Sequence, residues 1–160
     1  MLGSFAVGKT SLASRFVTGR FSDKYLTTVG VKVDRREVDV DGQSVTLIVW
    51  DLAGEDEFHS VQMTYIRGAA GYLLVIDGTR HETLATAIEL QERAEQEIGT
   101  VPFHVLINKT DLRDEWQVSE ADIKTLTDRG WHVQHTSAKT GEQVEEAFLH
   151  LARVALAMEA

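Results

Sequence analysis

The sequence has no cysteine and only one proline among its 160 residues. Without cysteine there can be no disulfide, no thiolate metal site, no cysteine nucleophile and no cysteine-linked lipid anchor. A reducing compartment fits this composition, and we expect a cytoplasmic protein without a direct lipid anchor. The chain also lacks low-complexity tracts and proline-rich stretches of the kind that link domains. We therefore expect one domain, residues 1–160, that acts as a monomer.

Positive charge is scarce as well. Lys and Arg total 16 against 25 Asp and Glu, which gives a formal net charge of −9 at pH 7. This balance argues against nucleic acid and anionic lipid as partners, because both favour a basic surface. No stretch of the sequence approaches the roughly 18 consecutive apolar residues that indicate a membrane span. Any phosphate-bearing ligand must therefore bind in a local pocket.

The apolar residues, 43% of the chain, form a regular alternation. Short β-branched or apolar runs alternate with longer segments of helical period, which predicts a doubly wound α/β domain with a mostly parallel sheet and helices on both faces. We expect strands over 31–40, 44–50, 71–76, 104–108 and 131–136, and helices over 9–18, 84–98, 119–129 and 143–158. The pair Asp41-Gly42 predicts a hairpin between the first two strands, which then lie antiparallel at one edge of the sheet.

Residues 3–10, GSFAVGKT, match the pattern GxxxxGK[ST] and run directly into a predicted helix. Glycines let the backbone curl so that successive N–H groups face phosphates, and the helix N-terminus adds its positive dipole end. In this pattern Lys9 reaches the β- and γ-phosphates and the Thr10 hydroxyl ligates Mg²⁺. The residues expected to contact nucleotide here are Gly3, Phe5, Ala6, Val7, Gly8, Lys9, Thr10 and Ser11.

Asp51 follows an apolar strand, at the end of the strand where α/β folds bind their ligands. We expect Asp51 to hold Mg²⁺ through water and the Gly54 N–H to meet a γ-phosphate oxygen. An Asp followed by Gly is also common in plain turns. The prediction therefore depends on the order and spacing of this segment after the phosphate-binding motif.

Two later segments carry the chemistry of base selection. In NKTD, residues 108–111, the carboxylate of Asp111 can accept from both the N2 amine and the ring N–H of guanine, a pairing that adenine does not offer. In TSAK, residues 136–139, the Ala138 N–H can meet guanine O6. The base-site residues are expected to be Asn108, Lys109, Asp111, Ser137, Ala138 and Lys139. An ATP-using protein with the same phosphate motif remains the alternative if Asp111 does not select guanine.

With these segments in this order, the chain resembles the Ras superfamily of small GTPases, closest to its Rab-like branch and to the Rab-like GTPases of bacteria. The resemblance covers essentially the whole sequence. Residues 50–58, WDLAGEDEF, are similar to the family's WDTAGQERF, and residues 21–30, FSDKYLTTVG, match its first switch. It implies Phe21 against the guanine ring, Tyr25 over the phosphates, and Thr28 on Mg²⁺ when the γ-phosphate is present.

The resemblance also implies a function. A GTP/GDP switch hydrolyses GTP with Mg²⁺, and protein effectors, exchange factors and activators recognise the loops around Thr28 and Gly54. The residues that would take part in hydrolysis are Lys9, Thr28, Gly54 and Glu55.

Two departures from the family pattern bear on hydrolysis. Glu55 stands where the family has the Gln that orients the attacking water; a carboxylate can accept from water and act as base, but it adds negative charge near the γ-phosphate. The alternative is a solvated glutamate in the acidic run 55–57. Phe5 would crowd the space that an arginine finger enters. A binding module with negligible hydrolysis therefore stays open beside the enzyme.

A third departure lies at the start of the sequence. Relatives have a strand of about five to seven residues before the first glycine, whereas here only Met1 and Leu2 precede Gly3. The first strand is therefore expected to be largely missing, either because the true start lies upstream of Met1, which we favour, or because the sheet has a gap there. If the chain is complete as given, we expect reduced stability and weak nucleotide binding.

The six histidines show no cluster at metal-ligand spacing. His132 and His135 lie three apart in a predicted strand, and the other four are scattered. We expect all six to pack or to face solvent.

Overall fold

A computed structural model of the chain describes residues 1–22, 28–57 and 60–159. The strands are β1 (Leu2–Gly3), β2 (Val31–Val40), β3 (Gln43–Leu52), β4 (Tyr72–Asp77), β5 (Phe103–Asn108) and β6 (His132–Thr136). The helices are α1 (Lys9–Thr18), α2 (Glu82–Ile98), α3 (Glu120–Asp128) and α4 (Val144–Glu159), with short 3₁₀ turns η1 (Met63–Ile66) and η2 (Arg113–Glu115). The predicted strands and helices are confirmed in type and order.

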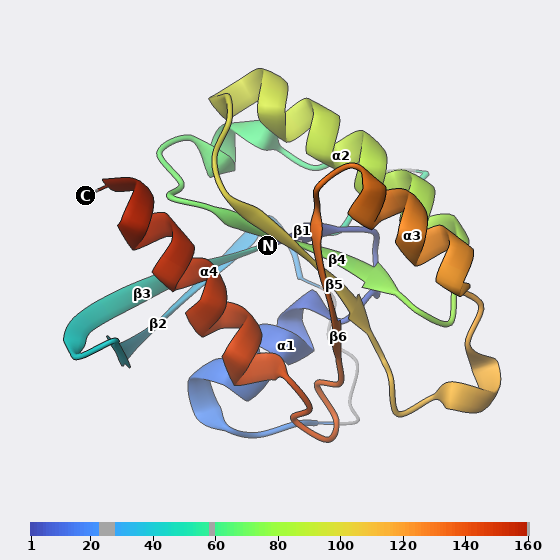
Figure 1. Cartoon of the computed structure of the whole chain (residues 1–160), viewed down its shortest axis with the longest axis horizontal. Helices are drawn as coiled ribbons and strands as arrows, with labels where there is room; N and C mark the ends of the chain where they lie inside the picture. Colours follow the sequence, from blue (N-terminus) through green and yellow to red (C-terminus); the bar gives the residue numbers. More distant parts are fainter. Residues whose placement is uncertain (23–27, 58–59, 160) are drawn as a thin grey trace.

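The central sheet has the strand order β1-β4-β5-β6, and every neighbouring pair is parallel. Figure 1 shows this sheet between two layers, with α2 and α3 on one side and α1 and α4 on the other. All six residues of β4 are buried, as expected of a parallel strand that is covered on both faces. The predicted fold class is thus confirmed.

Side chains of the central strands alternate between the two layers. Leu73 and Val75 of β4 pack with α1 and α4 in one apolar core, while Leu74 and Ile76 pack with α2 and α3 in the other. The period of two along a strand produces this division. The parallel pairing of β5 with β6 places His104 opposite His132 and Leu106 opposite Gln134.

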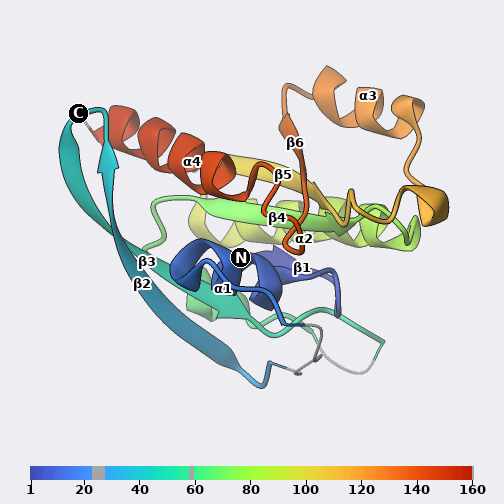
Figure 2. The same ribbon diagram turned by 90° about the horizontal axis from the view of Figure 1, so that it is seen from below.

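The long hairpin β2–β3 is antiparallel over its whole length, from Val31 opposite Leu52 to Val40 opposite Gln43. Its turn has positive φ at Asp41 (52°) and Gly42 (86°), as a two-residue hairpin turn requires. Figure 2 shows the hairpin curving toward α4, where Asp41 forms an ion pair of 2.9 Å with Arg153.

This hairpin is a separate two-stranded sheet rather than a continuous edge of the central sheet, contrary to the prediction. The reason is the length of β1, whose two residues offer β3 few backbone partners. The connection consists of a parallel bridge between Ser4 and Glu55 and a bond of 2.7 Å from the Met1 amine to the Trp50 carbonyl. Beside it, β3 and α4 enclose an apolar cavity of about 480 Å³.

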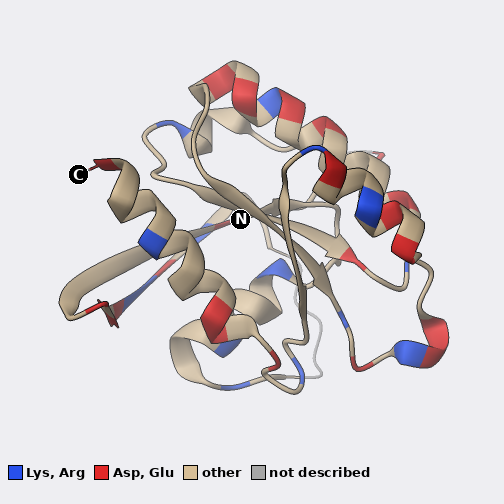
Figure 3. Ribbon diagram, in the orientation of Figure 1, with Lys and Arg blue, Asp and Glu red and all other residues tan. Residues whose placement is uncertain are grey.

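Local signals set the helix ends. Ser119 accepts from the backbone N–H of Asp122 while Asp122 accepts from that of Ser119, so α3 begins with a capping box. Gly99 ends α2 in a conformation with φ of 73°. Acidic residues recur along α2 (Figure 3), and Glu82, Glu89, Glu92 and Glu95 among them are exposed. In the described part of the chain, no helix combines the length and apolar character needed to cross a membrane.

Candidate nucleotide site

A cavity of about 450 Å³ opens beyond the carboxyl ends of the central strands. The predicted residues that line it are Phe5, Ala6, Gly8, Lys9, Thr10, Ser11, Phe21, Thr28, Gly54, Asn108, Lys109, Asp111, Ala138 and Lys139. Four further predicted residues, Gly3, Val7, Asp51 and Ser137, are buried. Tyr25 lies outside the described residues. Segments from both halves of the sequence therefore meet at one hollow, where parallel sheets bind their ligands.

The phosphate loop, residues 3–8, joins β1 to α1 and is held from outside by side chains of other segments. Three successive carbonyls accept hydrogen bonds: Phe5 O from Arg80 Nη2 (2.5 Å), Ala6 O from Lys109 Nζ (3.0 Å) and Val7 O from Asn108 Nδ2 (3.1 Å). These bonds fix the shape of the loop before a ligand arrives. Such preorganisation lowers the cost of ordering that binding would otherwise carry.

Two glycines permit this close packing. Gly8 has φ of 101°, and a Cβ placed on it would come within 2.3 Å of Asn108 Nδ2. A Cβ on Gly54 would lie 2.5 Å from the Cα of Phe5, so the segment after β3 approaches the phosphate loop backbone directly. A side chain at either position would push apart the segments that shape the cavity.

Lys9 is the first residue of α1, and only 6% of it is exposed. Its Nζ donates to the carbonyls of Ser4 (3.0 Å) and Gly3 (3.3 Å). Burial lowers the pKa of this amine to about 8, although the nearby Asp51 carboxylate partly opposes the shift. The positive end of the side chain is thus held in a poorly hydrated place, where an anion is attracted more strongly than in water.

The three residues predicted to hold the metal ion, Thr10, Thr28 and Asp51, lie together near the N-terminus of α1. Thr10 Oγ1 lies 2.5 Å from Asp51 Oδ2 and 2.6 Å from Thr28 Oγ1. Asp51 is 1% exposed, and its Oδ1 is buried with no hydrogen-bond partner in the described parts of the chain. A buried carboxylate oxygen without a partner is costly. Hydroxyl and carboxylate oxygens are the ligands that Mg²⁺ prefers, so the donor set fits this ion.

A second buried carboxylate, Asp77, supports the phosphate loop, and the sequence analysis missed it. Its Oδ2 accepts from Lys109 Nζ at 2.8 Å and from Arg80 Nε at 3.1 Å, so Asp77 orients both cations that reach the loop carbonyls. Burial by itself raises the pKa of this carboxyl, but bonds from Lys109 and Thr79 hold it below its ordinary value. The position of Asp77 at the end of a buried strand could have indicated that it belongs to the site. No feature of the sequence indicated that Arg80 contacts the phosphate loop.

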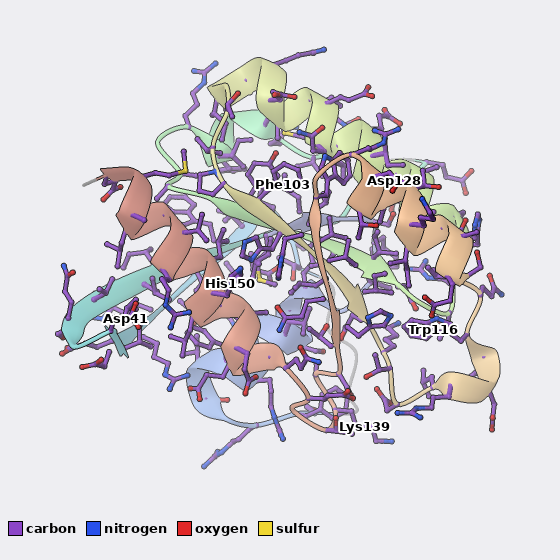
Figure 4. The ribbon with its side chains drawn as sticks, in the orientation of Figure 1. Asp41, Phe103, Trp116, Asp128, Lys139 and His150 are labelled. Atoms are coloured by element: carbon purple, nitrogen blue, oxygen red, sulfur yellow. The ribbon has the colours of Figure 1, made fainter. Side chains whose placement is uncertain are left out.

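On the base side, the structure brings 108–111 and 136–139 together. Asp111 Oδ1 accepts from Ser137 Oγ at 2.6 Å, and Asn108 Oδ1 accepts from Thr136 Oγ1 at 3.2 Å. The buried Ser137 is therefore placed to orient the Asp111 carboxylate. Lys139 lies beyond the end of β6 (Figure 4), where it lines the cavity.

Glu55 does not project into the cavity as a free carboxylate. Its Oε1 forms an ion pair of 2.9 Å with Arg93 of α2, and its Oε2 accepts from the Val61 backbone N–H at 2.5 Å. Its side chain is 16% exposed, so it is not the solvated glutamate of the alternative reading either. Arg93 also donates to the Val61 carbonyl at 3.0 Å. The pair therefore fastens the segment after β3 to α2.

The amino-acid sequence is similar to that of known proteins. A model of the Ras family matches residues 1–157. The Ras-related protein Rab-8B of Homo sapiens and that of Pongo abelii are each 36% identical to the chain over 155 residues. These alignments cover 96% of this chain and 75% of each relative. The similarity therefore includes the phosphate loop, the segment after β3 and both base-site segments.

Proposed function

The chain belongs to the Ras family, and we propose that its switch cycle takes place in the cavity between the phosphate loop and the segments 108–111 and 136–139. Members of this family bind GTP as molecular switches and hydrolyse it, so the chain is a GTPase. The observation that carries the placement is the convergence of Lys9, the Thr10–Asp51 pair and Asp111 on one cavity. The whole of 1–160 acts as one GTPase domain in this proposal.

Mg²⁺ is the proposed cofactor, held by Thr10, Thr28 and Asp51. Bound there it would neutralise negative charge on the β- and γ-phosphates. The support is the all-oxygen donor set and the buried Asp51 Oδ1 that has no protein partner in the described chain. Thr28 joins this set because its Oγ1 lies 2.6 Å from Thr10 Oγ1. Loss of the γ-phosphate would release the loop, which is the switch.

Hydrolysis is attack by water on the γ-phosphorus. The new P–O bond forms to the water oxygen while the bond to the β–γ bridging oxygen breaks, so GDP leaves with the electron pair and the water proton passes to phosphate or to a base. Lys9 and the Gly54 N–H would take up the charge that develops on the phosphate oxygens. Glu55 can serve as that base only after it leaves Arg93.

The Glu55–Arg93 pair favours slow hydrolysis as the second candidate behaviour. While Arg93 and the Val61 N–H hold the carboxylate, no side chain at position 55 orients the attacking water. Phe5 lines the same cavity and reduces the room for an arginine supplied by an activator. The chain would then hold GTP for long periods, and exchange rather than hydrolysis would set its state.

Guanine selection is assigned to Asp111. With Ser137 donating to its Oδ1, its other oxygen remains for the base. Asn108 ties the base-site segment to the phosphate loop through Val7. Base recognition and phosphate recognition are therefore mechanically connected.

Protein partners would recognise the surface next to the two switch segments. Val29, beside Thr28, is 88% exposed, and Trp50, directly before Asp51, is 44% exposed. Large apolar side chains in water favour a protein partner. The further expectations of a cytoplasmic location and of special closeness to bacterial Rab-like GTPases stay predictions.

Single-turnover hydrolysis of bound GTP tests the proposal. We expect Mg²⁺-dependent turnover that is lost in Lys9→Ala, and GTP binding that resists excess ATP. Asp111→Ala should lose this resistance, whereas Asp114→Ala, which removes a neighbouring exposed acid, should keep it. GTP binding that survives Lys9→Ala, or equal displacement by ATP and GTP in the unaltered chain, would refute the assigned site.

A further inference from the structure

Three histidines from different elements meet on the α4 side of the sheet, far from the phosphate loop. His104 of β5 and His132 of β6 are direct partners in the parallel register, and His150 comes from α4 (Figure 4). Their ring centroids are 4.4 to 4.5 Å apart in all three pairs. The expectation that the histidines form no cluster at metal spacing was therefore wrong, because strand register and helix packing join residues that are remote in sequence.

The buried member of this trio has an unusual environment. His104 is 3% exposed, and its Nδ1 is buried with no hydrogen-bond partner among the described residues. Buried polar atoms of native proteins are nearly always paired, because leaving one unpaired costs free energy. An imidazole nitrogen in this position therefore points to a ligand that would satisfy it.

The environment also lowers the pKa of two of the three rings, His104 and His132. Burial, followed by the neighbouring His132 and His150, lowers the pKa of His104 to about 4. Burial and then His150 lower the pKa of His132 as well. Neutral imidazoles offer lone pairs at neutral pH, and a metal ion does not have to displace protons from them.

We propose that His104, His132 and His150 bind one Zn²⁺ ion. One ring nitrogen from each lies within 4.8 Å of the other two. Tetrahedral Zn²⁺ has Zn–N distances of about 2.0–2.1 Å, which requires N···N separations of roughly 3.3 Å. Small rotations of the exposed His132 and the half-buried His150 would provide this contraction. Three imidazoles with one solvent-facing position is a recognised zinc donor set.

The zinc site is separate from the nucleotide site. His104 and His132 lie near the starts of β5 and β6, whereas Asn108 and Thr136 lie at their ends. Four strand residues span about 13 Å. Zn²⁺ would tie α4 to β5 and β6, so it is expected to stabilise the fold by mass action without entering the hydrolytic step. Zinc binding at this site is independent of how fast the chain hydrolyses GTP.

Calorimetric titration with Zn²⁺ tests the site. The chain is first saturated with GDP and excess Mg²⁺ and then freed of unbound nucleotide, so that phosphates do not capture zinc. We expect one Zn²⁺ per chain and a rise of the melting temperature. His132→Ala and His150→Ala should each weaken binding by more than tenfold, since even loss of a residue that only supports a ligand costs about ten- to a hundredfold.

His135→Ala is the matched control, since His135 stacks on Trp116 instead of joining the trio. It should bind Zn²⁺ as the unaltered chain does. Co²⁺ gives a second readout, because tetrahedral nitrogen ligation produces strong visible absorption that both trio variants should lose. Absence of one-to-one binding, or equal affinity in the trio variants and the control, would overturn the proposal.

Discussion

Lys9 makes nucleotide affinity depend on pH in a way that the structure predicts in sign and size. Its pKa of about 8 in the free chain means that the amine is about nine-tenths protonated one unit below that value and one-tenth protonated one unit above it. The phosphates favour the charged form, so binding must supply the missing proton. The dissociation constant of GDP should therefore rise about tenfold between pH 7 and pH 9.

Titration calorimetry in two buffers of different ionisation enthalpy measures this proton directly. At pH 9 binding should take up nearly one proton per GDP, and at pH 7 about one-tenth. Asp111→Ala is the control for titration of the guanine ring, because it removes the contact to the ring N–H and leaves Lys9 in place. A flat affinity profile, or proton release at pH 9, would refute the assignment of a desolvated Lys9 to the phosphates.

The free energy of unfolding of the nucleotide-free chain should also depend on pH. A lysine whose folded pKa lies below its unfolded value of about 10.5 binds fewer protons when folded, so stability rises with pH between about 8 and 10.5. Bound GDP should reduce that slope, because phosphate raises the pKa of the amine. Thermal melts across this range, with and without GDP, check the sign.

Two substitutions test the supports around the phosphate loop. Arg80→Ala removes the hydrogen bond to the Phe5 carbonyl. GDP binding should weaken about tenfold, because a partly exposed charge-assisted hydrogen bond is lost. Unchanged affinity in a fluorescent-nucleotide displacement assay would show that the phosphate loop keeps its shape without this bond. Arg93→Ala removes the ion pair that holds Glu55 Oε1 and leaves only the bond from the Val61 N–H to Oε2. If Glu55 is the base, the single-turnover rate of hydrolysis should rise at least tenfold. Glu55→Gln in the same background should abolish this increase.

Local sequence was enough to predict the strands, the helices and most of the residues that line the cavity. The run GSFAVGKT predicted a phosphate loop that leads into a helix, and the helix begins at Lys9 as expected. Apolar runs predicted β4 and β5, because strands that are buried on both faces need no polar alternation. Asp41-Gly42 predicted the hairpin turn, since few other pairs accept positive φ at both positions.

Other features depended on contacts between remote segments. Glu55 looked like a residue that would face either the γ-phosphate or solvent, but α2 brings Arg93 beside it. The separation of the hairpin from the central sheet followed from how few hydrogen bonds a two-residue β1 can form. Asp77 and Arg80 became visible as supports only when the ends of β4 and β1 lay side by side.

Local features could be predicted from the residues alone: the periodicity of strands and helices, the glycine pattern of the phosphate loop, and the hydroxyl and carboxylate oxygens of Thr10, Asp51 and Asp111. These properties are carried by residues that are close in the chain, so spacing and residue type are sufficient to predict them. Which distant groups meet depends on the folded chain. The pairing of Glu55 with Arg93 and the meeting of three histidines depend on strand register and helix placement, which result from packing of the whole core and are not encoded in any single segment.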